Sequence, residues 1–275
     1  MVNKDLAGKI AMITGAGSGI GAGIAKVLFE RGATLALCDL YGESVKKTSN
    51  SLSKNILHDS VDVTNIQDIE NFRNKILDVY GTIDILVANA GVIGAKGFSE
   101  RKNYSKNDWE DTFDVNVLGM VNSADAIVEI MKEKKYGKII NIASQGGRKP
   151  RGLGDMYRGN VQTPYLVSKS AAIQYTHLLA IELGSYNINV NAVCPGVIWT
   201  PIWESIAVNH IKQNPNLKNM SPKEVFDEFA VKARTPLGRA QTPEDIGNTV
   251  AFFASENSSE ITGQALNVNG GATLD

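Results

Sequence analysis

Tyr165 and Lys169 lie four residues apart, and this pair is the strongest candidate for chemistry in the chain. Apolar residues at helical spacing from Leu166 to Leu183, followed by Gly184, predict a helix that places both side chains on one face. An isolated tyrosine loses its proton near pH ~10, and a neighbouring ammonium group lowers the pKa of that hydroxyl by stabilising the phenolate. The pair can therefore act as a general acid and base, although such spacings also occur on ordinary helix surfaces.

A glycine-rich loop near the N-terminus is the second candidate. The apolar run 9–14 predicts a buried strand, and it is followed by the loop Gly15-Ala16-Gly17-Ser18-Gly19-Ile20-Gly21 and by a helical stretch over 22–31. Strand, glycine loop and helix in this order bring free N–H groups close to a bound phosphate. The sequence therefore predicts a dinucleotide site at this loop.

Asp39 ends the next predicted strand, 34–39, and follows Gly19 by 20 residues. A carboxylate at this position would bind the ribose hydroxyl groups of a dinucleotide. It would also repel a 2′-phosphate, and no arginine or lysine stands at Ala16, Gly17 or Leu40 to offset that repulsion. The sequence therefore favours NAD over NADP as the cofactor.

Predicted strands and helices alternate along the whole chain. The strands are expected at 9–14, 34–39, 56–63, 83–88, 137–142, 187–194 and 265–268, and the helices at 22–31, 43–52, 65–80, 109–134 and over the segment from Tyr165 to Leu183. Alternation of this kind predicts an α/β fold, a single Rossmann-like doubly wound domain over 1–275 with a central parallel seven-stranded sheet flanked by helices. Ligands bind such sheets at the carboxyl ends of the strands, where Asp39, Asp62 and Asn89 fall.

Composition excludes several classes of function. The 275 residues are 43% hydrophobic and carry a net charge of −1, so no global field favours nucleic acid or an acidic membrane. No apolar run approaches the ~18 residues that span a bilayer, and the N-terminus lacks the apolar segment of a signal peptide. We expect a cytoplasmic protein without a metal, because the three histidines are scattered and Cys38 and Cys194 are read as packed thiols.

Several motifs occur together in a fixed order. They are Thr14-Gly15-x-x-x-Gly19-Ile20-Gly21, Asn89-Ala90-Gly91, Asn116, Ser144, Tyr165-x-x-x-Lys169 and Pro195-Gly196. With them the chain resembles the short-chain dehydrogenase/reductase family, and the resemblance runs from Lys9 to the closing segment 267–271. Each motif alone is weak, but the ordered set is highly specific because each falls on a predicted strand end or helix.

The resemblance implies a catalytic tetrad. Tyr165 would be the general acid and base, Lys169 would lower its pKa and hold the nicotinamide ribose, and Ser144 would orient the substrate oxygen. Asn116 would bind a water molecule that continues a proton relay through Lys169, although an asparagine here can also be structural. The protein would supply the proton path while the cofactor carries the hydride.

The resemblance also implies the cofactor contacts. They are expected at Gly15, Ser18, Gly19, Ile20, Gly21, Asp39, Asp62, Val63, Asn89, Ala90, Gly91, Tyr165, Lys169, Pro195, Gly196, Ile198 and Thr200. Two of these have credible structural alternatives, because Asp62 can cap a strand end and Thr200 can cap a helix that begins at Pro201.

The chain departs from the family pattern between Ser144 and Tyr165, where an extra substrate-side segment is expected at about 146–163. It contains Arg148, Lys149, Arg151 and Arg158, which either meet an anionic substrate group or form a solvated loop. The expected substrate contacts are Ser144, Tyr165, Arg151, Trp199 and Trp203.

A helical lid over the substrate is expected at about 200–239, where the capping box Ser221-Pro222-Lys223-Glu224 starts a helix. The lid resembles those of polyol, diol and acetoin dehydrogenases. We therefore expect an NAD-dependent enzyme that interconverts a small secondary alcohol and its ketone, assembled as a homotetramer or homodimer. The alternatives are a 3-oxoacyl-thioester reductase, a dehydrogenase of an anionic hydroxy substrate, and a non-catalytic NAD-sensing protein.

Overall fold

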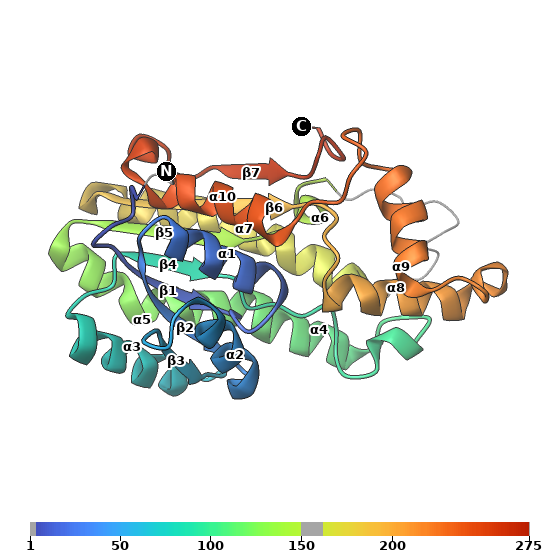
Figure 1. Ribbon diagram of the computed structural model, residues 1–275, viewed down its shortest axis with the longest axis horizontal. Coiled ribbons are helices and arrows are strands. Elements are labelled where there is room, and N and C mark those ends of the chain that lie inside the picture. The colour runs from blue at the N-terminus through green and yellow to red at the C-terminus, as the bar shows by residue number, and fades with distance from the viewer. Residues whose placement is uncertain (1–3, 150–161, 275) are drawn as a thin grey trace.

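Seven parallel strands form one sheet in the order β3-β2-β1-β4-β5-β6-β7, within the residues 4–149 and 162–274 that the computed structural model describes (Figure 1). The strands are β1 (Ile10–Thr14), β2 (Thr34–Asp39), β3 (Leu57–Ser60), β4 (Ile85–Ala88), β5 (Gly137–Ile142), β6 (Ile188–Pro195) and β7 (Ala265–Val268). All neighbouring strands pair in parallel. The chain winds outward in one direction from β1 to β3 and in the other from β4 to β7, so the strand order reverses between β1 and β4. A crevice for a ligand is expected at that reversal.

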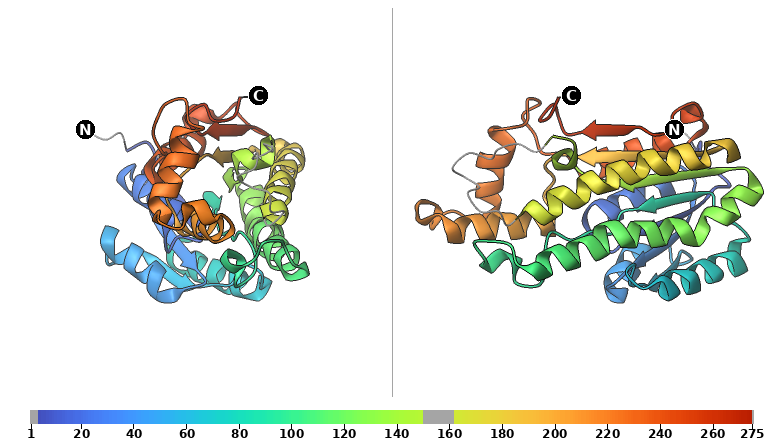
Figure 2. Two further views of the ribbon diagram at one scale, coloured as in Figure 1. Left: turned by 90° about the vertical axis from the view of Figure 1, so that its right-hand side faces the viewer. Right: turned by 180° about the vertical axis from the view of Figure 1, so that it is seen from behind.

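Helices cover both faces of the sheet (Figure 2). One face carries α3 (Ile66–Tyr80), α5 (Gly119–Lys134) and α7 (Thr163–Leu183), and the other carries α1 (Gly19–Glu30), α2 (Gly42–Leu52) and α10 (Pro243–Ala254). Because both faces are covered, the central strands β1, β4, β5 and β6 are buried along their whole length. This explains why they appear in the sequence as continuous apolar runs.

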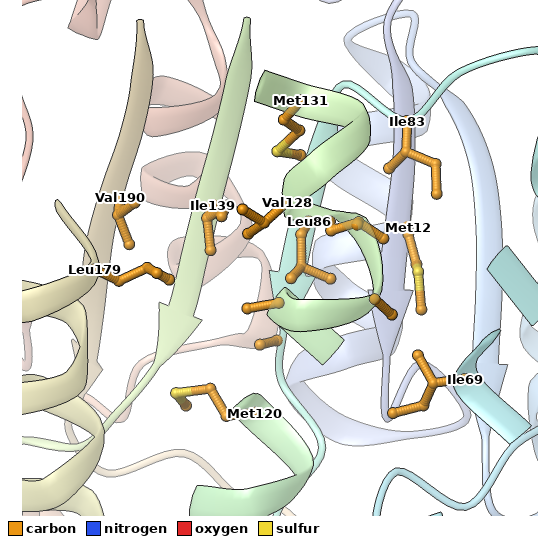
Figure 3. Packing of buried hydrophobic residues seen from close by; sticks show 14 of the residues in the cluster. Met12, Ile69, Ile83, Leu86, Met120, Val128, Met131, Ile139, Leu179 and Val190 are labelled. Atoms are coloured by element: carbon orange, nitrogen blue, oxygen red, sulfur yellow. The ribbon is translucent and has the colours of Figure 1, made fainter. Parts of the chain in front are cut away.

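Alternate side chains of each strand enter two separate cores. Met12, Leu86, Ile139 and Val190 pack against α3, α5 and α7, as Figure 3 shows for the centre of this layer. Their neighbours along the strands, such as Ile13 on β1, pack against α1, α2 and α10. Because successive side chains of a strand point to opposite faces, each strand packs against both helical layers, and this holds the sheet in position between them.

The segment predicted to be a lid, called the lid below, lies beyond the carboxyl ends of the strands, at the right of Figure 1. It consists of α8 (Pro201–Gln213), the short α9 (Pro222–Val225) and a π-helical segment, Phe226–Lys232. Thr200 caps α8, since its side chain accepts a hydrogen bond from the backbone N–H of Trp203, and the capping box of Ser221 and Glu224 starts α9 as predicted. Phe226 is buried between Trp199 and Trp203 and packs this segment onto the body of the molecule.

The seven-stranded parallel sheet is as predicted, but several boundaries differ. β3 ends at Ser60, so Asp62 and Val63 lie in the loop that follows it. The predicted helix 109–134 is three segments: α4 (Lys106–Phe113), which starts at a capping box of Ser105 and Asp108, a π-helical turn (Asp114–Leu118), and α5.

Two helices were not predicted from the sequence as separate elements. α10 begins at Pro243, and Thr242 and Asp245 form the same kind of capping box as that of α9, so its start was readable in the sequence. The short α6 (Gln145–Arg148) follows Ser144 directly. Single turns of 3₁₀ helix are present at Phe98–Glu100, Gly184–Tyr186, Pro215–Leu217 and Glu256–Ser258.

Candidate active site

The glycine loop after β1 is held in a backbone conformation that other residues adopt with strain. Gly15 and Gly19 have φ values of +63° and +52°. At Gly21 a Cβ atom would stand 2.1 Å from the carbonyl oxygen of Gly15, well inside contact distance. The first turn of α1 therefore lies directly against the loop, and its free N–H groups face the carboxyl edge of the sheet.

Asn89 fixes the neighbouring edge of the crevice. Its side-chain amide donates to the carbonyl oxygens of Thr14 and Gly15, both at 2.9 Å. In return, the hydroxyl oxygen of Thr14 accepts hydrogen bonds from the backbone N–H groups of Asn89 and Ala90 at 3.1 Å. These four bonds join the ends of β1 and β4 across the reversal, so Asn89 supports the site in addition to lining it.

The Asp39 carboxylate is fixed at the end of β2. One oxygen accepts from the backbone N–H of Gly17 at 2.9 Å, and the other accepts from that of Tyr41 at 3.0 Å. A Cβ atom at Gly17 would lie 2.9 Å from this carboxylate, so the glycine allows the close approach. A positioned carboxylate beside a glycine cradle fits the ribose and pyrophosphate of a dinucleotide.

A cavity of about 310 Å³ runs along the carboxyl ends of the strands from Asp39 to Tyr165 and Trp203. Every residue predicted to contact the cofactor lines it. Further lining residues, which were not predicted as contacts from the sequence, are Leu40, Tyr41, Val61, Val92, Val115, Ile142, Ala143, Pro201 and Ile202. Most of these are chain neighbours of a predicted contact, and that adjacency was the available signal.

The catalytic candidates meet at the end of this cavity. Tyr165 and Lys169 lie on α7, one turn apart, with the lysine nitrogen 5.8 Å from the centre of the tyrosine ring. Lys169 is only 4% exposed, and its ammonium group donates to the carbonyl oxygen of Ile142 at 2.8 Å. Ser144 follows β5, and its hydroxyl oxygen accepts from the backbone N–H of Gly146 at 3.2 Å. Two elements far apart in sequence thus bring the three side chains together.

Burial controls the ionisation of this pair in the protein alone. Burial raises the pKa of Tyr165 above its ordinary value, and a hydrogen bond with Ser144 opposes that rise. Burial also lowers the pKa of Lys169 to about 8. Desolvation is thus the largest influence on the Tyr165 pKa in the protein without a ligand, and the lowering of that pKa by Lys169 stays a prediction.

Asn116 lies in the π-helical turn and is fully buried. Its amide oxygen accepts from the backbone N–H of Val92 at 2.8 Å, and its amide nitrogen donates to the carbonyl oxygen of Val92 and to the hydroxyl of Ser168. A Cβ atom at Gly91 would lie 3.2 Å from the Asn116 oxygen and 3.4 Å from the Lys169 nitrogen, which places Asn116 next to Lys169. The contacts tie the loop after β4 to α7, and Ser168 is a partner that sequence reasoning missed.

A second cavity, of about 110 Å³, adjoins the first on the lid side. Trp203 lines both cavities, and its contact with substrate stays a prediction. Trp199 lies outside both lining sets: its ring packs 5.2 Å from that of Phe226, because it serves to hold the lid segment against the core. Arg151 and Arg158, also considered as substrate contacts, lie outside the described residues, whereas Lys149 lines the second cavity.

Residues 4–149 and 162–274 contain no group of three or more histidine, cysteine, aspartate or glutamate side chains placed to hold a metal ion. In the same ranges, no helix has the length and apolar character needed to cross a membrane.

Residues 15–273 match a family model described as enoyl-(acyl carrier protein) reductase. Together with the fold and the arrangement of the site, this match shows that the chain belongs to the short-chain dehydrogenase/reductase family and is an oxidoreductase.

Individual relatives cover nearly the whole chain. The (2S)-[(R)-hydroxy(phenyl)methyl]succinyl-CoA dehydrogenase subunit BbsD of Thauera aromatica is 35% identical over 269 residues, 97% of each chain. The structure of NAD⁺-bound xylitol dehydrogenase is 30% identical, with a TM-score of 0.84 over 97% of this chain and 99% of that one. The 3-ketoacyl-(acyl-carrier-protein) reductase of Brucella melitensis, complexed with NADH, is 28% identical, with a TM-score of 0.81 over 98% and 100%.

Proposed function

We propose that the protein is an NAD-dependent dehydrogenase that interconverts a small secondary alcohol, of the polyol, diol or sugar type, with its ketone. The observation that carries the proposal is the meeting of Ser144, Tyr165 and Lys169 where the dinucleotide cavity joins the cavity under the lid. The similarity of the protein to xylitol dehydrogenase supports the choice of substrate class.

When bound, the nicotinamide cofactor supplies the hydride acceptor or donor. In alcohol oxidation, Tyr165 takes the hydroxyl proton as general base, and Ser144 donates a hydrogen bond to the substrate oxygen. Burial raises the pKa of Tyr165. The positive charges of Lys169 and of the oxidised nicotinamide would oppose this rise, because they favour the phenolate form. With its own pKa near 8, Lys169 can hold or release the proton that leaves the site.

Asp39 supports the preference for NAD. Its two backbone hydrogen bonds hold the carboxylate at the cavity wall, where it would bind ribose hydroxyl groups and repel a 2′-phosphate. The remaining roles stay proposals: the other cofactor contacts, a relay water at Asn116, one catalytic domain over 1–275 and a location in the cytoplasm.

We also propose a homotetramer or homodimer. Leu178 and Ile181 on α7 are 58% and 81% exposed, and Leu118 beside α5 is exposed as well, so the outer face of these two helices is apolar. Light scattering after size-exclusion chromatography measures the molar mass of the oligomer. A monomer at micromolar protein concentration would contradict the proposed oligomer.

A second candidate is a 3-oxoacyl-thioester reductase. The similarity to the Brucella melitensis 3-ketoacyl-(acyl-carrier-protein) reductase favours it, and that structure is a complex with NADH. The identity of the cofactor therefore does not separate the two candidates, and only the substrate does.

The test is a dehydrogenase assay that follows the absorbance of reduced cofactor with NAD or NADP. The panel contains polyols, diols, sugars and a 3-oxoacyl thioester, and we expect turnover of an alcohol with NAD. Tyr165→Phe should lower kcat by about 10²–10⁴-fold, the usual contribution of general acid–base catalysis, while NADH binding measured by fluorescence is kept.

Tyr104→Phe is the matched control, because Tyr104 lies outside both cavities and packs on Trp109. Equal activity of Tyr165→Phe and Tyr104→Phe would contradict the mechanism. Turnover of the thioester alone would select the second candidate, and a strong preference for NADP would overturn the role of Asp39.

A further inference from the structure

We infer that Asn209 is a positioning residue of the substrate site: it holds α8 against the loop that follows β4 and thereby sets the size of alcohol that the smaller cavity accepts. This inference rests on the proposed function, because it concerns which alcohols the site takes. The sequence gave no role to Asn209, and this residue is not a lining residue of either cavity.

The side chain of Asn209 is buried and bonded to the backbone of a distant segment. It is 8% exposed, and its amide nitrogen lies 3.3, 3.3 and 2.6 Å from the carbonyl oxygens of Phe98, Ser99 and Arg101. These acceptors belong to the 3₁₀ turn Phe98–Glu100 and the residue after it, against which α8 packs (Figure 1). One amide group therefore joins the lid to a loop far earlier in the chain.

The segment that accepts these bonds is itself fixed. Asp108 of α4 is fully buried, and its carboxylate accepts from the backbone N–H of Ala95 at 2.9 Å and forms an ion pair with Arg101. A Cβ atom at Gly94 would lie 2.8 Å from this carboxylate, so the glycine allows the close approach. Asn209 therefore anchors α8 to a segment that α4 holds in place.

The anchor lies on the same face of α8 as two side chains of the substrate cavity. Ile202, Ile206 and Asn209 are spaced by four and three residues, so they share one face of the helix. Ile202 and Ile206 line the smaller cavity, and Ile206 is buried in a small cluster with Phe98, against which Tyr165 packs. A shift of α8 away from Phe98 would therefore move this wall of the cavity away from Tyr165.

Two other contacts join α8 to this loop, and neither fixes its position as closely. Lys212 forms an ion pair with Glu100, but both side chains are exposed, by 44% and 59%, and solvent screens such pairs. The contact of Ile206 with Phe98 is buried, but the hydrophobic effect has no preferred direction. Hydrogen bonds from an amide to carbonyl groups depend on distance and angle, so Asn209 supplies the directional contact.

The experiment compares diols that differ only in the length of their apolar tail. Wild-type protein is assayed with NAD on 1,2-butanediol, 1,2-hexanediol and 1,2-octanediol. We expect kcat/KM to fall by about 10-fold or more along the series, because a fitted pocket discriminates by at least this factor against added methylene groups.

Asn209→Asp removes the N–H donors with little change of shape and places a carboxylate against the carbonyl oxygens. KM for 1,2-butanediol should rise about 10-fold, the scale of one lost buried hydrogen bond, and the selectivity against 1,2-octanediol should fall by a similar factor. Asn209→Leu removes the donors without adding a charge. It should change the selectivity in the same direction, so the test does not depend on the folding of one variant.

Asn219→Asp is the matched control, because it makes the same chemical change at an exposed asparagine of the lid. This variant should keep the wild-type selectivity. Equal kcat/KM for the three diols in wild type, unchanged selectivity in both Asn209 variants, or the same loss in Asn219→Asp would overturn the inference. An equal fall in kcat for all three diols would also overturn it, because that pattern indicates general damage to the fold.

Hydrogen exchange separates this inference from the proposed function. Backbone amide exchange is measured by mass spectrometry in wild type, Asn209→Asp and Asn219→Asp without substrate. We expect about 10-fold faster exchange in α8 and in segment 94–101 of Asn209→Asp alone, with unchanged exchange in α1.

That result supports the positioning role even if no diol is oxidised and the proposed function fails. Unchanged exchange in α8, with turnover of the diols by wild type, would overturn the inference and leave the proposed function standing. Faster exchange in α1 as well as in α8 would also overturn it, because the substitution would then loosen the whole fold.

Discussion

The dinucleotide half and the substrate half of the site are built by different means. Around the dinucleotide cavity, backbone geometry does most of the work: glycines allow close approach, and Asp39 and Asn89 are held by backbone hydrogen bonds. Under the lid, the walls are side chains from segments far apart in sequence, such as Lys149, Arg234 and Thr273. The first half therefore depends on the conformation of the backbone. In the second half, the shape and charge of the walls can be changed by single side-chain substitutions.

The difference also concerns energetics. A cradle made of main chain tolerates almost no added volume, because a clash with backbone atoms is not relieved by rotating a side chain. Side chains of the lid, in contrast, pack in small separate clusters around Phe98, Phe226 and Leu217. Substitutions should therefore have larger effects on the dinucleotide side than on the substrate side.

The largest effect is expected from Gly21→Ala. The added Cβ would meet the carbonyl oxygen of Gly15 at 2.1 Å and the amide of Asn89 at 2.6 Å, so the loop must open. NADH affinity should fall more than 100-fold, measured by fluorescence titration. Gly184→Ala is the control: nothing lies within 4 Å of a Cβ there, and it should keep affinity and stability within about 1 kcal/mol. Unchanged affinity in Gly21→Ala would break the contrast between the two halves.

An intermediate effect is expected from the paired changes Trp203→Leu and Trp199→Leu. Trp203 lines both cavities, so its loss should raise KM for the alcohol about 10-fold with little change in NADH affinity. Trp199 packs on Phe226, so its loss should lower the unfolding free energy by about 1–3 kcal/mol and change KM less. Steady-state kinetics and chemical denaturation measure the two quantities. The reverse pattern would show that Trp199, not Trp203, contacts substrate.

The smallest effect is expected from Lys169→Met. The quantity compared is the thermal stability of wild type relative to the variant as the pH changes. Below pH 8 the buried lysine is protonated in both states, and its desolvation cost is constant. Between about pH 8 and the ordinary lysine pKa near 10.5, only the unfolded state holds the proton, so wild-type stability should rise with pH relative to the variant.

The measurement is the melting temperature of both proteins without cofactor from pH 6 to pH 10. We expect the difference between wild type and Lys169→Met to be flat below pH 7 and to shift by a few degrees in favour of wild type above pH 8. A difference that stays flat up to pH 10 would contradict the lowered pKa of Lys169.

Sequence reasoning predicted the dinucleotide half well because its parts are local. The glycine loop directly follows β1, and Asp39 ends the next strand, so order along the chain already implies nearness in space. Boundaries were less well predicted where short signals were overlooked, as with the capping box of Ser105 that starts α4 three residues before Trp109. The π-helical turn that holds Asn116 had no signal in the pattern, because its hydrogen bonds to Val92 and Ser168 are tertiary contacts.

The sequence by itself determined the parallel sheet, the glycine cradle and the helix that carries Tyr165 and Lys169, because periodicity and backbone preference are local properties. Only the tertiary structure decided the ionisation of that pair, since burial and the bond from Lys169 to the carbonyl of Ile142 depend on what packs around them. It also decided which of the two tryptophans faces the cavities. Burial and long-range contacts follow from the packing of the whole chain, and no local pattern encodes them.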